Sequence, residues 1–422
     1  MKKINTAPIS GTQELLPSDQ MVFDRLKQEI IDNSKARGYL NIETPILERT
    51  EVLLSKSGGE TEKQIYKVVK TFESTEDSTE ALRFDHTVPL ARYVVEHENN
   101  LAFPFKVAQI GENFRGERAQ RGRFRELYQC DIDVIGRGGL SLEYDADVLA
   151  TLIDMYRAFG IKTSVIARIS NRKILKGLLE GMNLEEKAAD VYSIIDHSEK
   201  VPAEKTEAAL DEIGLNSNEK AKILEFISLN GSASLVAEKL RAFNIENETF
   251  KTGISELILV MQLLEDEGYN EIIADMKIVR GLDYYTGTVF EFFLPEYRYV
   301  GSVGGGGRYE NLAEYFTDQK FPGVGGSIGL DRLFYVLKEE GLIDFGVEKP
   351  VDVAILPMTN SEVKFALEVA KKFRAEGRKV TVVYGDKKLG DKMKYAASIA
   401  RYAVVIGETE VASGKYEIKE FI

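Results

Sequence analysis

The chain is poor in the residues that form disulfides and zinc clusters. Among its 422 residues there is one cysteine, Cys130, and there are three histidines, His86, His97 and His197. A single cysteine excludes an intramolecular disulfide, and so few thiol and imidazole groups give no plausible zinc cluster. Any metal ion is therefore expected to be a hard cation held by carboxylates and substrate phosphates.

Long apolar runs are also absent. Hydrophobic residues make up 44% of the chain and charged residues 29%, which is typical of a soluble globular protein without a membrane-spanning helix. The N-terminus has two lysines but no apolar segment behind them, so it does not resemble a secretory signal. We expect a cytoplasmic location and no membrane contact.

A net positive charge is lacking as well, because 55 lysines and arginines stand against 68 aspartates and glutamates, which gives a formal net charge of −13. Nonspecific affinity for nucleic acid comes mostly from phosphate neutralisation by lysine and arginine, so the balance argues against a protein that coats nucleic acid indiscriminately. An acidic body with local basic surfaces can still hold one polyanion that docks in the right register.

The order of patterns along the chain predicts an α+β fold in two to four units. Apolar spacing predicts helices at 19–38 and 144–159, and strands at 106–110 and 127–135 form a hairpin with a long loop. The predicted domains are the first part of a strand-containing main domain, a mainly helical insertion, the second part of the main domain and a small β-α-β-α-β domain, at residues 1–170, 171–270, 271–345 and 346–422.

The loop of that hairpin is rich in arginine. From Phe114 to Gly136 the chain reads FRGERAQRGRFRELYQCDIDVIG. Guanidinium groups present paired donors that match phosphate and carboxylate oxygens, so this loop is a candidate polyphosphate or nucleic-acid site. On charge alone, a solvated charged hairpin explains the same residues.

The order of residues in this loop closely resembles the second signature motif of histidyl-tRNA synthetases, which are class II aminoacyl-tRNA synthetases. A second segment, VRGLDYYTGTVFEF from Val279 to Phe292, resembles the signature that separates the histidine enzymes from the rest of class II. YLNIETPILERTEVLLSK, which contains Pro45, resembles the first class II motif, a dimer-interface element in that family. The resemblance implies a class II antiparallel sheet flanked by helices, a helical insertion, a C-terminal α/β anticodon-binding domain and a homodimer.

The resemblance also implies an activity. Such an enzyme activates L-histidine with ATP and Mg²⁺, releasing pyrophosphate, and then transfers histidine to the 3′ end of tRNA(His). A carboxylate that attacks a phosphate brings like charges together, so cations must stabilise the transition state and no protein nucleophile is needed. The alternative from another class is a catalytically inactive, synthetase-like regulatory subunit of ATP phosphoribosyltransferase.

Site residues follow from matching positions in these motifs. The resemblance implies catalytic roles for Arg115, Arg280 and Arg332. It implies histidine binding by Asp85, Thr87, Gln129, Asp133, Arg280, Tyr284, Tyr285 and Gly305. It implies ATP binding by Arg115, Glu117, Arg123, Phe124 and Arg332, and it leaves the ligands of Mg²⁺ unassigned. Taken alone, Arg332 is equally a surface helix residue, and Tyr284 and Tyr285 are equally an aromatic pair in the core.

Gly304 to Gly307 precede an Arg-Tyr pair, as in a glycine turn of the family beside the histidine pocket, and a flexible loop is the other interpretation. The chain departs from the family pattern next to Asp85: many bacterial members have glutamate at that position, and His86 stands where relatives with aspartate often have leucine.

The small C-terminal domain is locally basic. Its lysines and arginines could face RNA or could simply be a solubilising surface. They are Lys371, Lys372, Arg374, Arg378, Lys379, Lys387, Lys388, Lys392 and Lys394.

Overall fold

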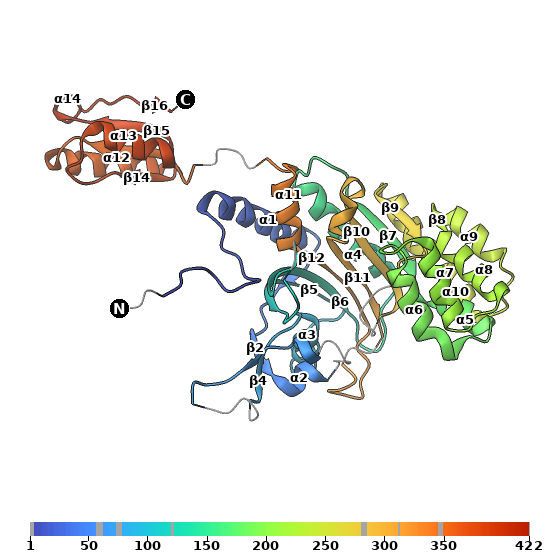
Figure 1. The fold of residues 1–422 in the computed structure, drawn as a ribbon. Coiled ribbons are helices and arrows are strands. Elements are labelled where there is room, and N and C mark those ends of the chain that lie inside the picture. The colour runs from blue at the N-terminus through green and yellow to red at the C-terminus, as the bar shows by residue number, and fades with distance from the viewer. Residues whose placement is uncertain are drawn as a thin grey trace. The chain divides into compact units, whose positions relative to one another are not determined.

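The computed structural model describes residues 4–55, 62–72, 78–119, 122–279, 285–310, 313–344 and 349–421 (Figure 1). The chain divides into two compact units. The first contains residues 1–14 and 23–344, and the second contains residues 15–22 and 345–422. Within the described ranges, no helix is long and apolar enough to cross a membrane.

A large sheet is the centre of the first unit, and most neighbouring strands in it run antiparallel. Among the described strands of this sheet, only two pairs are parallel: β1 (Leu40–Asn41) with β5 (Phe105–Phe114), and β7 (Ile166–Asn171) with β9 (Ile272–Asp275). In spatial order the strands are β1 (Leu40–Asn41), β5 (Phe105–Phe114), β6 (Glu126–Ile135), β12 (Gly323–Gly329), β11 (Gly304–Tyr309), β10 (Tyr285–Phe293), β7 (Ile166–Asn171), β9 (Ile272–Asp275) and β8 (Asn230–Gly231).

The hairpin predicted around the arginine-rich loop is confirmed. Strands β5 and β6 pair from Phe105 opposite Ile135 to Phe114 opposite Glu126, so the loop begins at the far end of two long arms. Because side chains alternate along a strand, Gln129 and Asp133 lie on one face of β6 and Cys130 lies on the other. The polar residues of the motif thus share one face of the sheet.

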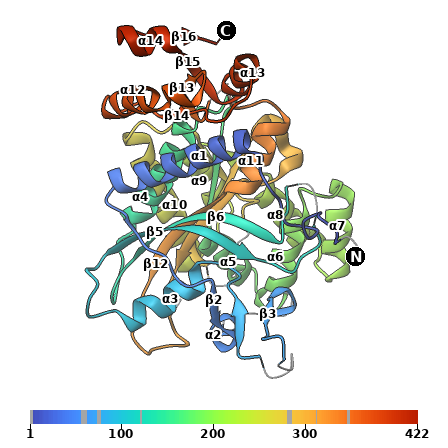
Figure 2. The same ribbon diagram turned by 90° about the vertical axis from the view of Figure 1, so that its left-hand side faces the viewer.

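Helices pack on the face that carries Cys130. They are α1 (Pro17–Ala36), α4 (Glu143–Ala158) and α11 (Leu330–Glu339) (Figure 2). The ring of Phe23 on α1 contacts Phe334 on α11 at 5.3 Å between centroids. The predicted helix at 19–38 is therefore confirmed, and it ends as expected at a left-handed glycine, Gly38, with φ of 81°.

The glycine run was expected as a turn or loop, and that prediction is wrong. Gly304 to Gly307 belong to strand β11, between β10 and β12. A side chain on Gly306 would overlap the carbonyl oxygen of Gly325, and one on Gly325 would overlap the carboxylate of Asp133. Glycine is required here by close packing across the sheet, and not by a bend in the chain.

A smaller sheet and two helices lie beside the hairpin. Its strands are β2 (Leu47–Arg49), β4 (Glu80–Leu82) and β3 (Lys67–Val68), in that spatial order. The other elements are α2 (Thr50–Leu54), the 3-10 helix η1 (Glu62–Gln64) and α3 (Thr87–Glu96). Helix α3 starts directly after Phe84–His86.

Between β7 and β9 the chain is mainly helical. The elements are α5 (Arg172–Gly181), η3 (Glu185–Lys187), α6 (Ala188–His197), α7 (Ala203–Glu212), α8 (Ser217–Ser228), α9 (Ala233–Arg241) and α10 (Glu248–Asp266), with β8 as a short edge strand. Gly177 and Gly253 let α5 and α10 approach closely, because a side chain on Gly253 would lie 2.7 Å from the backbone nitrogen of Ile174. The predicted boundaries at 171 and 270 remain predictions.

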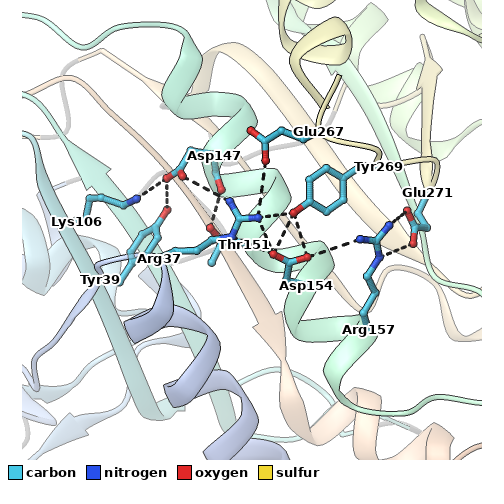
Figure 3. A network of polar contacts seen from close by, with 10 residues as sticks. All are labelled: Arg37, Tyr39, Lys106, Asp147, Thr151, Asp154, Arg157, Glu267, Tyr269 and Glu271. Carbon is cyan, nitrogen blue, oxygen red and sulfur yellow. Dashed lines mark hydrogen bonds and ion pairs between the residues drawn. The ribbon is translucent and has the colours of Figure 1, made fainter. Parts of the chain in front are cut away.

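A polar network ties the end of this helical segment to α1 and α4 (Figure 3). The Arg37 guanidinium donates to Asp154 Oδ2 at 2.6 Å and also contacts the Tyr269 hydroxyl. Arg157 forms two hydrogen bonds of 2.7 Å with Glu271. Bidentate and shared contacts of this kind fix geometry better than isolated surface pairs. The network holds α4 in place behind the site-bearing sheet.

The second unit has the predicted alternation of strands and helices. Its sheet has the order β14 (Val380–Val382), β13 (Val351–Pro357), β15 (Ala400–Ile406) and β16 (Lys419–Glu420), and the first three strands are parallel. The helices are η5 (Asn360–Glu362), α12 (Val363–Ala375), α13 (Leu389–Ile399) and α14 (Glu408–Ser413). Val353, Phe373 and Val404 share its core.

One part of the predicted basic surface is wrong. Lys392 is only 2% exposed, and its Nζ donates to the Pro357 carbonyl at 2.7 Å. The other eight cationic residues of that set are exposed. Lys392 therefore closes the end of β13 from inside and adds nothing to a surface for RNA.

Candidate active site

A cavity of about 900 Å³ opens on the sheet face opposite α4. Its walls come from the β5–β6 hairpin, from β10, β11 and β12, from the start of α11 and from α5 and α6. The residues predicted for the site that line it are Arg115, Glu117, Arg123, Phe124, Gln129, Tyr285, Gly305 and Arg332. Segments far apart in the sequence therefore meet at one cavity.

Arg115 directly follows β5, and three contacts fix its guanidinium. Nε donates to the Phe84 carbonyl at 3.2 Å, and Nη2 donates to Gln129 Oε1 at 3.0 Å. The guanidinium carbon lies 4.6 Å from the centre of the Phe84 ring. A planar cation held in this way keeps a constant orientation toward an anion, because little side-chain entropy remains to be lost on binding.

Arg332 reaches the cavity from the first turn of α11. Its Nε donates to the Gly122 carbonyl at 3.2 Å, and its Nη1 donates to the Ser302 carbonyl at 2.7 Å. The side chain is half-buried and lines the cavity, so it is not the exposed helix residue of the alternative interpretation. Two fixed guanidinium groups thus face the same space from different elements.

Gln129 connects three strands at the floor of the cavity. Its Oε1 accepts from Asn113 Nδ2 and from Arg115, both at 3.0 Å, and its Nε2 donates to Ser327 Oγ at 2.9 Å. Every polar atom of the amide therefore has a defined partner. The arrangement fixes which edge of the amide is an acceptor and which is a donor.

Glu117, Arg123 and Phe124 form the loop side of the cavity. Arg123 Nη1 lies 3.6 Å from Glu117 Oε2, and both side chains are partly exposed. An exposed pair at this distance contributes little to stability, so both groups stay available to a ligand. Gln120 and Arg121 lie outside the described residues.

Asp85, Thr87 and Asp133 are next to the cavity but do not line it. Asp85 Oδ1 accepts from the Val88 backbone nitrogen at 3.0 Å and so caps α3, while Thr87 is the first residue of that helix. Burial raises the pKa of Asp85, against the opposing effect of this hydrogen bond. Their place in histidine binding stays a prediction.

Asp133 is only 5% exposed. Burial raises the pKa of Asp133 to about 8, and the negative charge of Asp131 acts in the same direction. The Tyr309 hydroxyl donates to Asp133 Oδ1 at 3.0 Å, and Tyr309 lies opposite Tyr285 in the β10–β11 pair. Arg280 and Tyr284 lie outside the described residues.

Some residues at the cavity carried no motif in the sequence. The insertion contributes Arg172, Tyr192, Asp196 and His197, and Arg172 lies over the Tyr192 ring at 5.1 Å. Nothing in the local sequence around these residues indicated that this segment returns to the sheet.

The sequence alone assigns no role to Asp331, although this residue directly precedes Arg332. Its Oδ1 accepts from Gln13 Nε2 at 2.7 Å, and its Oδ2 accepts from the Tyr128 backbone nitrogen. Burial raises the pKa of Asp331 to about 6. This carboxylate joins the N-terminal segment, β6 and α11, so it helps to hold Arg332 in position.

An antiparallel sheet that carries a cationic hairpin loop on one face, helices on the other and a helical segment inserted between its strands defines a class II aminoacyl-tRNA synthetase fold. The model of the histidyl-tRNA synthetase family matches residues 11–333, and that of an anticodon binding domain matches residues 352–421. The chain belongs to the histidyl-tRNA synthetase family.

Relatives match over nearly the whole length. A histidine–tRNA ligase of Clostridium tetani is 42% identical, over 99% of this chain and 95% of the relative. The crystal structure of histidyl-tRNA synthetase from Nostoc sp. PCC 7120 has a TM-score of 0.88 at 36% identity, covering 99% of this chain and 95% of that one. The predicted family and fold class are confirmed.

The regulatory-subunit alternative is not favoured. A structure from Bacillus halodurans C described as an ATP phosphoribosyltransferase regulatory subunit/histidyl-tRNA synthetase has a TM-score of 0.80, but its identity is 22% over 96% of this chain and 99% of that one. Such a likeness shows the fold alone. The relatives at about 40% identity are named histidine–tRNA ligases.

Proposed function

We propose that the chain is a histidine–tRNA ligase that uses ATP. It forms histidyl-adenylate and pyrophosphate from histidine and ATP, and then transfers histidine to the 3′ end of tRNA(His). The observation that carries the proposal is the meeting of Arg115, Gln129 and Arg332 at one cavity in a chain of this family.

The first step needs cations at the reacting phosphate. A carboxylate oxygen of histidine attacks the α-phosphorus of ATP, the bond from that phosphorus to the bridging oxygen breaks, and pyrophosphate leaves. In the proposal Arg115 contacts the α-phosphate and the amino-acid carboxylate, and Arg332 binds the γ-phosphate. Donors that are already oriented toward developing charge lower the barrier without reorganisation, and the contacts of both arginines support this role.

Recognition of histidine uses the polar group at the back of the cavity. Asp85, Thr87 and Gln129 bind the α-amino group, and Asp133 and Tyr285 face the imidazole. A buried carboxylate that holds a proton is able both to donate and to accept, which suits an imidazole. A site built from such groups rejects amino acids without a matching side chain, since its own polar atoms would be left unpaired.

ATP is bound with Mg²⁺ in this proposal. Among the described residues no group of three or more histidine, cysteine, aspartate or glutamate side chains could form a metal cage. Glu117 and Glu291 line the cavity, and one or two carboxylates with substrate phosphates are sufficient for Mg²⁺. When bound, the ion neutralises phosphate charge. We expect exchange activity to be lost with a chelator and restored by Mg²⁺.

The second step needs tRNA at two places. The match of residues 352–421 to an anticodon binding domain and the exposed lysines and arginines of that unit support its contact with the anticodon. In the second step a ribose hydroxyl of the terminal nucleotide attacks the histidyl carbonyl, and AMP leaves. We also propose a homodimer, a cytoplasmic location and the four-part domain division at residues 1–170, 171–270, 271–345 and 346–422.

The test is ATP–pyrophosphate exchange with the purified full chain and a panel of amino acids. We expect exchange with histidine and none above background with the other amino acids. Charging of a tRNA(His) transcript should follow in the same preparation. Exchange driven by a different amino acid, or the absence of histidine-dependent exchange from folded protein with Mg²⁺ present, would overturn the proposal.

A further inference from the structure

A buried imidazole–carboxylate pair lies directly behind the candidate histidine pocket. His86 is 1% exposed and Asp131 is 6% exposed. His86 Nδ1 lies 3.0 Å from Asp131 Oδ2. With the Asp131 carboxylate as the acceptor in this contact, His86 Nδ1 is the donor. None of the site roles described above uses either residue.

His86 connects the start of α3 to two strands of the large sheet. Its backbone carbonyl accepts from Gln109 Nε2 on β5 at 3.3 Å and from the Leu90 nitrogen at 2.9 Å, and its ring contacts Asp131 on β6. Gly111 on β5 leaves room for this arrangement, since a side chain there would lie 2.6 Å from Arg83 Nη2 and 3.6 Å from His86 Nε2. The first turn of α3 is therefore anchored on the hairpin.

Asp131 stands between two residues assigned to histidine binding. Gln129, Asp131 and Asp133 are each two residues apart on β6, so their side chains lie on the same face of the sheet. Asp131 is paired with Ser327 of the neighbouring strand β12. The charge of Asp131 contributes to the raised pKa of both Asp85 and Asp133, although burial is the largest cause for each. The charge of Asp131 thus acts on two carboxyl groups that are assigned to histidine binding.

The pair has few other partners. His86 Nε2 and Asp131 Oδ1 have no hydrogen-bond partner among the described residues, although both atoms are buried. A buried polar pair is weak support for stability, because desolvation offsets its attraction. Its value lies in the fixed geometry that it imposes on the elements it joins.

We propose that His86 is a positioning residue for the amino-acid site. By holding Asp131 it sets the position of Asp85 and Thr87, at the start of α3, relative to Gln129 and Asp133 on β6. This inference rests on the proposed function. An ammonium group bound between α3 and β6 depends on that spacing, whereas the phosphates of ATP meet Arg332, which belongs to α11.

The experiment compares His86→Leu with His86→Asn in the exchange assay, measuring the KM for histidine and the KM for ATP separately. Leucine removes the donor, while the asparagine amide keeps one near the place of Nδ1. We expect the leucine variant to raise the histidine KM about tenfold or more, as for the loss of one hydrogen bond to a charged group. The asparagine variant should stay within about threefold, and the ATP KM within about twofold for both.

A double variant guards against loss of folding. Removing both partners, as in His86→Leu with Asp131→Val, leaves no buried unpaired charge, so the protein should fold even if the single variant does not. We expect it to show the same raised histidine KM. Asp154→Asn, in the network of Figure 3, is the control: it perturbs a partly buried polar cluster on α4 and should leave the histidine KM unchanged.

The outcomes separate the two proposals. A wild-type histidine KM in folded His86→Leu or in the double variant, or an equal rise in the KM for histidine and ATP, would overturn the positioning role. So would an asparagine variant as impaired as the leucine variant. Wild-type protein without histidine-dependent exchange would instead overturn the proposed function itself.

Discussion

Asp133 should make the stability of the protein fall as pH rises. Burial raises the pKa of Asp133 to about 8 in the folded chain, helped by the charge of Asp131. In an unfolded chain an aspartate titrates near about 3.9. Between these values the folded state holds a proton that the unfolded state has released, so the free energy of unfolding decreases with each pH unit.

The size of the effect follows from the shift. A full proton difference is worth about 1.36 kcal/mol per pH unit, and the slope flattens as pH approaches the folded pKa. From pH 6 to pH 8 the titration of Asp133 should therefore lower the free energy of unfolding by about 2 kcal/mol. Asp133→Asn removes the titration but keeps an oxygen that can accept from Tyr309, so packing at the site is preserved.

The measurement is guanidinium denaturation at pH 6 and pH 8, followed by circular dichroism because the chain has no tryptophan. The wild type should lose about 2 kcal/mol more between the two pH values than Asp133→Asn. Equal losses in the two proteins would refute the claim that Asp133 is buried with its proton. Other buried acids act equally in both proteins, so the difference isolates Asp133.

Three further changes test separate parts of the structure. Arg332→Ala should lower histidine-dependent exchange about 10²–10³-fold if it removes one transition-state donor, and near-normal exchange would contradict its role. Asp145→Ala leaves Arg308 buried without the partner that it contacts at 2.7 Å, so denaturation should show a loss of about 3–5 kcal/mol; a loss below about 1 kcal/mol would contradict this. Gly325→Ala pushes on the Asp133 carboxylate and should raise the histidine KM more than the ATP KM, and an unchanged ratio of the two constants would count against that packing.

The hairpin and its cations were predictable because their signals are local. Alternating apolar residues at 106–110 and 127–135 predicted β5 and β6, and the arginines between them indicated a candidate anion site. The local sequence could not show whether Arg332 lines a cavity or lies on the surface. That depends on the carbonyls of Gly122 and Ser302, which orient its guanidinium in the structure.

The glycine strand could not be predicted in the same way. Nothing near Gly306 in the sequence states that the backbone of β12 will approach it, or that Gly325 must make room for a carboxylate on β6. Such requirements arise across neighbouring strands that are far apart in the chain. For the same reason the sequence could not indicate that Tyr192 of the insertion faces the cavity.

His86 shows how a departure from a family pattern can be interpreted. The sequence marked it as unusual beside Asp85, but its consequence depends on Asp131, which lies on another strand. The buried pair therefore gives the unusual residue at position 86 a defined partner on β6.

The most direct test of the account is a crystal structure of the chain with histidine and a nonhydrolysable ATP analogue. We expect the Arg115 guanidinium within hydrogen-bonding distance of the α-phosphate and Arg332 at the γ-phosphate, with the α-amino group of histidine between α3 and Gln129. An analogue bound outside the cavity, or bound there with neither arginine touching a phosphate, would contradict the central claim that these two side chains form one clamp.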